Sequence, residues 1–231
     1  MRIPEPFLIR DCSLVPIATG LVAQNLREFR DLLSRAPEGS IYTHFYESLL
    51  RFSFDDPEFR NDFALWAKHS LHDSVLAERL GVIDPHDFPT IEDLRKRLLD
   101  IIDDRIYEAG FIPWARTGDE FYFLLSQSQV FDTSIRVETP KDLALIFPDL
   151  STGSIYYHFI EARRRLPNRK DDFTSWLAEF GDEYRDLCQR LGRVEYYFCS
   201  LSDLKGRLSR VFRDWRGFKR QNRRKKKNDP A

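Results

Sequence analysis

The heptapeptide Gly39-Ser-Ile-Tyr-Thr-His-Phe45 recurs as Gly153-Ser-Ile-Tyr-Tyr-His-Phe159, 114 positions later, with a single residue changed. Downstream of it, Asp62-Phe-x-x-Trp66 recurs as Asp172-Phe-x-x-Trp176. Further matches keep the same order across roughly 100 residues, which is the behaviour expected of an internal repeat. An ordered series of matches is much harder to obtain by chance than one heptapeptide. The sequence therefore indicates an internal duplication.

Each copy is predicted to begin with a short strand followed by a helix. Aromatic and β-branched residues at Phe7–Ile9 and Phe121–Leu125 favour strands. Asn25 and Thr139 occupy matching N-cap positions, each with an acidic residue three places on. Pro140 then lies at the first helical position, where its missing N–H costs nothing.

The repeated heptapeptide is itself predicted to begin a helix, with Ser154 as N-cap. The residues behind this prediction lie on one helical face: Ile155, His158, Phe159, Ala162 and Leu166. Helical periodicity also predicts a third helix over Phe173–Leu191, whose twin over Phe63–Leu80 is expected to bend near His72. The last helix of each copy begins with a capping box, at Thr90-x-x-Asp93 and Ser200-x-x-Asp203.

These elements predict a mainly α fold (α+β, with one short strand per repeat). We expect two homologous helical halves in a pseudo-twofold arrangement, because duplicated halves can pack like a fused homodimer. The predicted divisions are repeat one at 1–109, a linker at 110–118, repeat two at 119–215 and a tail at 216–231. The tail holds eight basic residues against one acid and is predicted to be disordered.

Composition excludes several classes of protein. The 231 residues contain 36 Lys and Arg against 37 Asp and Glu, so bulk charge gives no sign of a nucleic-acid binder. An apolar content of 42% argues against a disordered chain, and no apolar run is long enough to span a membrane. The first residues lack an apolar signal segment. Three cysteines without metal-type spacing favour a reducing, cytoplasmic location.

Five motifs carry a family resemblance: Phe7-Leu-Ile-Arg-Asp-Cys-Ser-Leu-Val-Pro-Ile-Ala-Thr-Gly20, Pro37-Glu-Gly-Ser-Ile-Tyr-x-His-Phe45, Asn61-Asp-Phe-Ala-x-Trp-Ala67, Leu76-Ala-Glu-Arg-Leu80 and Ile83-Asp-Pro85. Over about residues 6–215 the chain resembles a prokaryotic domain-of-unknown-function family, number 5752. The resemblance implies no reaction, cofactor or substrate. In the second copy, Leu187-Cys-Gln-Arg-Leu191 replaces the fourth motif.

Eight repeated polar and aromatic residues are the candidates for a ligand or interaction site: Tyr42, His44, Asp62, Trp66, Tyr156, His158, Asp172 and Trp176. The histidines could form a two-histidine site, but their apolar helical face favours buried core residues with one hydrogen bond. The aspartates are better explained as N-caps than as catalytic acids. The tryptophans, which could stack on a sugar or base, fit the core better.

Other candidates have weaker support. His69-x-x-His72-Asp73 has metal-ligand spacing but no counterpart in the second copy, and Cys12 near Arg10 has no histidine fixed beside it. We therefore expect no catalytic residue, no metal and no cofactor, and no phosphate-loop or zinc motif is present in the sequence. The tail residues Arg220, Arg223, Arg224, Lys225, Lys226 and Lys227 are candidates for binding anions.

The favoured function is a non-enzymatic, cytoplasmic regulatory or scaffold protein that binds an unknown protein partner or a small metabolite between its halves. The motivation is a repeated His, Tyr, Asp and Trp set without a recognisable catalytic arrangement. One alternative is an enzyme that acts on a sugar or phosphorylated sugar with His and Asp as acid and base. A second is association with nucleic acid, or another anionic surface, through the basic tail.

Overall fold

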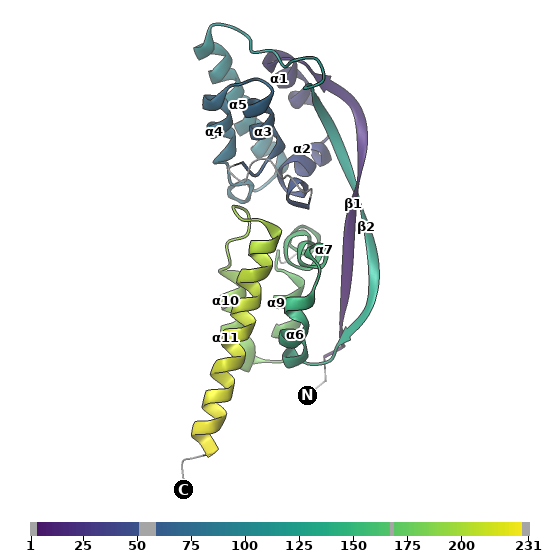
Figure 1. The fold of residues 1–231 in the computed structure, drawn as a ribbon, viewed down its shortest axis with the longest axis vertical. Coiled ribbons are helices and arrows are strands. Elements are labelled where there is room, and N and C mark those ends of the chain that lie inside the picture. The colour runs from purple at the N-terminus through teal and green to yellow at the C-terminus, as the bar shows by residue number, and fades with distance from the viewer. Residues whose placement is uncertain (1–3, 51–58, 167–168, 228–231) are drawn as a thin grey trace. The chain divides into compact units, whose positions relative to one another are not determined.

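The computed structural model describes residues 4–50, 59–166 and 169–227, with the backbone alone at residues 49, 50, 86 and 216–227. The described residues are mainly helical, and the two strands among them form one sheet (Figure 1). In chain order the elements are β1 (Phe7–Ala23), α1 (Leu26–Arg35), α2 (Glu38–Phe45), α3 (Asp62–His69), α4 (Ser74–Gly81), α5 (Ile91–Ala109), β2 (Phe121–Val137), α6 (Pro140–Ile146), α7 (Thr152–Ile155), α8 (Ala162–Arg165), α9 (Asp172–Ala178), α10 (Arg185–Gly192) and α11 (Leu201–Lys227). Among the described helices, none is both long and apolar enough to cross a membrane.

The chain divides into two compact units. The 14–128 unit contains α1–α5, and the 129–231 unit contains α6–α11 together with residues 1–13. The division falls within both strands. The first half of β1 thus packs with α6–α11, and the first half of β2 packs with α1–α5. The compact units differ from the expected repeats by this exchange of half-strands.

The strands are 17 residues each, so the prediction of short strands is wrong in length. They run antiparallel, as two matching hydrogen bonds indicate: Thr19 Oγ1 donates to the Phe123 carbonyl, and Thr133 Oγ1 donates to the Ile9 carbonyl, each at 2.6 Å. Residues 15–18 and 129–132 are exposed. The alternation of apolar and polar residues that reveals a half-buried strand is therefore missing from the middle of each strand.

Most of the predicted caps are confirmed. Asn25, Thr90 and Thr139 each accept a hydrogen bond from the backbone N–H three residues on, and Pro140 opens α6. Ser200 does the same for Asp203 at 3.0 Å. The cap of α7 is Ser151, whose hydroxyl accepts from the Ser154 N–H at 2.9 Å, so the prediction of Ser154 is wrong. Ser154 lies inside the first turn.

The repeated heptapeptide forms a helix in both copies, as predicted, but the type of helix differs between the copies. In the first copy it is the α-helix α2. In the second copy, α7 continues into a π-helical segment, η4 (Tyr156–Glu161), and then α8. The heptapeptide does not reveal this difference, because six of its seven residues are the same in both copies. π-Helical turns are rare and often occur at functional sites.

The predicted third helix is two helices in each copy. Between α9 and α10 the chain turns at Gly181, whose φ of 95° suits glycine. Between α3 and α4 it turns at His72, with φ of 54°, where a bend was expected. Both pieces of each pair bury apolar residues, so the periodicity continues across the break.

Helix α11 continues through Lys227, so the prediction of a disordered tail is wrong for the backbone of residues 216–227. Its Arg, Lys and Gln residues have high helix propensity, which lets the helix extend beyond its buried face. The side chains from Arg216 onward, and all of residues 228–231, lie outside the described residues. The predicted anion-binding side chains of the tail are therefore not placed.

Candidate functional site

His44 is buried in the 14–128 unit, with 2% of its surface exposed, and both ring nitrogens have partners. Nδ1 lies 2.7 Å from Oδ2 of Asp62, and Nε2 lies 3.0 Å from the backbone nitrogen of Leu124. A backbone N–H can only donate, so Nε2 must accept. The proton of the neutral ring is then on Nδ1, which donates to Asp62.

His158 has the same arrangement in the 129–231 unit. Its Nδ1 lies 2.7 Å from Oδ2 of Asp172, and its Nε2 accepts from the backbone N–H of Arg10 at 2.9 Å. Arg10 and Leu124 lie in the first halves of β1 and β2. Each histidine therefore holds a strand that comes from a distant part of the sequence. The expectation of buried histidines holds, but each has two hydrogen bonds instead of one.

The aspartates are not N-caps, which corrects the favoured interpretation. Asn61 caps α3 and Asp171 caps α9, each accepting from the backbone N–H three residues on. Asp62 and Asp172 are the first helical residues, where the positive end of the helix favours a carboxylate. Their side chains bond the histidines instead of the helix ends. Burial is the main cause that raises the pKa of Asp171.

The tryptophans hold the chain just before each strand. The indole N–H of Trp66 donates to the Asp119 carbonyl at 2.9 Å, and that of Trp176 donates to the Glu5 carbonyl at 2.8 Å. Both rings are buried. We use the name strand anchors for the two sets that hold the strands: His44, Asp62 and Trp66 in one unit, and His158, Asp172 and Trp176 in the other.

The remaining repeated candidates, Tyr42 and Tyr156, are buried in their own units. The ring of Tyr42 stacks on Tyr46 with centroids 4.6 Å apart. Tyr156 is the first residue of η4. Each unit thus brings its His, Asp and Trp to one strand, whereas its Tyr lies in the helical core.

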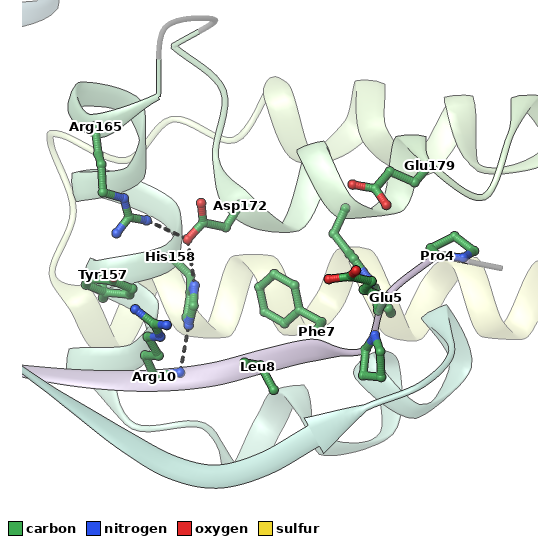
Figure 2. Close-up of a pocket in the computed structure, with 12 residues that line it drawn as sticks. Pro4, Glu5, Phe7, Leu8, Arg10, Tyr157, His158, Arg165, Asp172 and Glu179 are labelled. Carbon is green, nitrogen blue, oxygen red and sulfur yellow. Dashed lines mark hydrogen bonds and ion pairs between the residues drawn. The ribbon is translucent and has the colours of Figure 1, made fainter. Parts of the chain in front are cut away.

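A pocket of 880 Å³ opens beside the strand anchor of the 129–231 unit. Figure 2 shows β1 along one side of it and side chains from the helical segments on the other. The strand side contributes Pro4, Glu5, Pro6, Phe7, Leu8 and Arg10. The helical side contributes Tyr157, His158, Arg165, Asp172, Trp176 and Glu179. The volume is within the range of small-molecule sites.

Arg165, one of the two arginines that line the pocket, already has a partner within the fold. Arg165 donates to Oδ2 of Asp172 at 2.7 Å, and its guanidinium lies 4.2 Å from the ring centre of Tyr157. Burial alone would lower the pKa of Arg165, but Asp172, Tyr157 and Glu161 together raise it. Asp172 therefore accepts from both Arg165 and His158, as the dashed lines of Figure 2 mark.

Three other charged side chains of the pocket have no partner among the described residues. Arg10, Glu5 and Glu179 are exposed, and their side chains make no hydrogen bond or ion pair within this part of the chain. The repeat pattern missed Arg10, Tyr157 and Glu179 because it selects identical residues. A comparison of unlike positions would have found them, since Leu124, Thr43 and His69 stand at the matching positions of the first copy.

Two of the weaker candidates, Cys12 and Asp73, make structural contacts inside the fold. Cys12 is buried, with its thiol 3.5 Å from the Gly153 carbonyl. Asp73 caps α4 and accepts from Arg105 at 2.7 Å. Within the described ranges, no group of three or more His, Cys, Asp and Glu side chains is arranged to hold a metal ion.

Residues 4–213 match the family of unknown function DUF5752. The chain is also similar to a solved structure described as the structure of OrfY from Thermoproteus tenax, with 26% identity and a TM-score of 0.73. That similarity covers 90% of this chain and 95% of the other. No curated protein matches the chain.

Proposed function

Because the chain belongs to the family of unknown function DUF5752, we propose its function from its own geometry: a cytoplasmic, non-enzymatic regulatory or scaffold protein that binds a small metabolite. The binding site is the pocket of the 129–231 unit. The observation that carries the proposal is a pocket of ligand size that contains charged side chains without partners. This site lies within one unit, whereas the sequence suggests a site between the halves.

The local backbone supports this choice. Tyr157 and His158 of the pocket belong to the π-helical segment η4, whereas the matching segment of the 14–128 unit is the α-helix α2. A π turn is less favourable than an α turn and is commonly retained for a function. The unit with the π turn is also the unit whose pocket has unpaired charges.

The strand anchors support a non-enzymatic role. A general acid or base needs a nitrogen or oxygen that can reach the substrate proton. Both ring nitrogens of His44 and His158 are already bonded, one to a carboxylate and one to a strand. An enzyme acting on a sugar or sugar phosphate would have to break one of these bonds, so this alternative ranks second.

We also infer a duplicated ancestor with pseudo-twofold halves, and a reducing compartment. Support for the duplication comes from the two strand anchors, which use matching residues and matching hydrogen bonds in each unit. Support for the compartment comes from Cys12, Cys188 and Cys199, none of which forms a disulfide within the described residues. Association of the basic tail with nucleic acid is a separate prediction, tested by truncation before residue 216.

The test is a thermal-shift screen of the full chain against amino acids, organic acids, sugars, sugar phosphates and nucleotides. We expect at least one compound class to raise the Tm of the wild type, because a ligand that binds only the folded state stabilises it. The double variant Arg10→Gln with Glu179→Gln should lose that shift. An equal shift in the variant, or none in the wild type, would overturn the proposed site. If NMR shows that the protein converts the bound compound into a product, the enzyme alternative is favoured.

A further inference from the structure

The unpaired charges of the pocket differ in sign from one end to the other. In Figure 2, Arg10 lies at the end where Tyr157 and Arg165 are, and Glu5 and Glu179 lie at the opposite end. The ring of Phe7 lies between these two ends in the same view. The pocket is thus cationic at one end, anionic at the other and apolar between.

We propose that the pocket binds a bipolar ligand, a molecule with an anionic group and a cationic group joined by an apolar segment. The inference rests on the proposed function and specifies its ligand class. The anionic group pairs with Arg10, because Arg165 is already bonded to Asp172. The cationic group pairs with Glu5 and Glu179. The apolar segment crosses Phe7 and Leu8.

Simpler ligands fit the charges less well. A plain anion that reaches Arg10 gains one cation but also enters the field of two unpaired carboxylates, and a plain cation leaves Arg10 unpaired. A metal ion is disfavoured, because no cluster of three or more suitable side chains occurs in the described part of the chain. A bipolar molecule satisfies all three charges at once, and each charge-assisted hydrogen bond adds to its affinity.

The strand limits the separation of the two backbone positions that carry the charges. Glu5 and Arg10 are five positions apart, so their Cα atoms are at most about 18 Å apart even in a fully extended chain. Each charge lies at the end of a flexible side chain, so the exact gap depends on the rotamers of Arg10 and Glu5. Suitable probes therefore include flexible amino acids whose charges are separated by a few methylene groups.

The 14–128 unit keeps only one of these three charges, because Asp119 matches Glu5. At the positions that match Arg10 and Glu179 it has Leu124 and His69, and at the position that matches Tyr157 it has Thr43. The anchor histidine and aspartate are the same in both units, so the bipolar charges are independent of strand anchoring. Arg10→Leu, which introduces the residue of the other copy, is therefore expected to remove ligand binding without releasing the strand.

The experiment is calorimetric titration of the full chain with 4-aminobutanoate, 6-aminohexanoate and 8-aminooctanoate. Hexanoate and hexylamine serve as probes with one charge each. We expect at least one bipolar probe to bind tenfold or more tightly than either singly charged probe. Arg10→Gln should reduce its affinity to that of hexylamine, and the double variant Glu5→Gln with Glu179→Gln should reduce it to that of hexanoate. The matched controls Arg136→Gln and Glu138→Gln, exposed and outside the pocket, should change nothing.

The outcomes separate the inference from the proposed function. Equal affinity for hexanoate and the bipolar probes would overturn the bipolar ligand but leave a metabolite pocket. Absence of binding by all five probes, with a pocket-dependent hit in the metabolite screen, would do the same. Absence of any hit in both experiments would overturn the proposed function as well. Circular dichroism of each variant establishes that it folds.

Discussion

The backbone N–H of Arg10 donates to Nε2 of His158 at 2.9 Å, across 148 positions of the sequence. The matching bond, from Leu124 to His44, spans 80 positions. In both cases the histidine of a helical unit holds a strand that the chain delivers from elsewhere. The most conspicuous residues of the repeated heptapeptide thus stabilise the long-range pairing of strand and helices, and the ligand site lies beside one of them.

Replacement of either anchor histidine by phenylalanine should destabilise the protein. The ring volume is kept, but the strand N–H loses its partner and the carboxylate loses one hydrogen bond, which costs about 1–3 kcal/mol for each variant. Urea unfolding of His44→Phe and His158→Phe measures the loss. Hydrogen exchange should show faster exchange of the Leu124 or Arg10 amide in the corresponding variant only.

The control for these variants is His69→Phe, because His69 is exposed and belongs to neither anchor. Its effect should stay within about 0.5 kcal/mol. Anchor variants as stable as this control would show that the histidines do not hold the strands.

Alanine at Gly153 should be much more harmful than alanine at the matching Gly39. A Cβ at Gly153 would lie 2.5 Å from the backbone oxygen of Cys12 and would also meet the Asp11 carboxylate. At Gly39 it would lie 2.9 Å from the end of the flexible Leu125 side chain. We expect Gly153→Ala to cost about 1–3 kcal/mol, as overpacking does, and Gly39→Ala clearly less. Equal losses in urea unfolding would contradict the close approach of β1 to α7.

Asp171→Asn should remove a pH dependence of stability. Burial, the largest cause, raises the pKa of Asp171 above its usual value of 3.8. The folded state therefore holds this proton more tightly, and stability falls as the pH rises from 3.8 through the raised pKa. Asparagine can still cap the helix, as Asn61 does in the other unit. The difference in unfolding free energy, wild type minus variant, should decrease over that pH interval.

The reverse exchange is the matched control. Asn61→Asp places a carboxyl group at a fully buried cap, so it should acquire a pH dependence of the same sign. A wild-type minus Asp171→Asn difference that rises with pH, or stays constant, would contradict the assignment of Asp171.

The sequence predicts the helical elements and their caps because these depend on neighbouring residues. Asn25, Thr90 and Thr139 are recognisable as caps from the acidic residue three positions on. The prediction of the capping residue is wrong where two residues that can cap are adjacent, as at Asn61 and Asp62. Local sequence does not distinguish the residue that caps the helix, Asn61, from the residue that bonds the histidine, Asp62.

Long-range relationships were not predictable in the same way. Nothing local to His158 indicates that its partner is the N–H of Arg10, and nothing local to Trp176 indicates the Glu5 carbonyl. The pocket was missed for a related reason. Repetition draws attention to what two copies share, whereas the charges of the pocket, Arg10 and Glu179, are residues that the copies do not share.

The most direct test of the account is to detect the hydrogen bonds between histidine and strand by NMR in the ¹⁵N-labelled full chain. We predict ¹⁵N–¹⁵N couplings through the hydrogen bonds, from the Leu124 amide to Nε2 of His44 and from the Arg10 amide to Nε2 of His158, with the ring proton on Nδ1 in both residues. A proton on Nε2 of either histidine, together with the absence of its coupling, would contradict the claim that these residues anchor the strands.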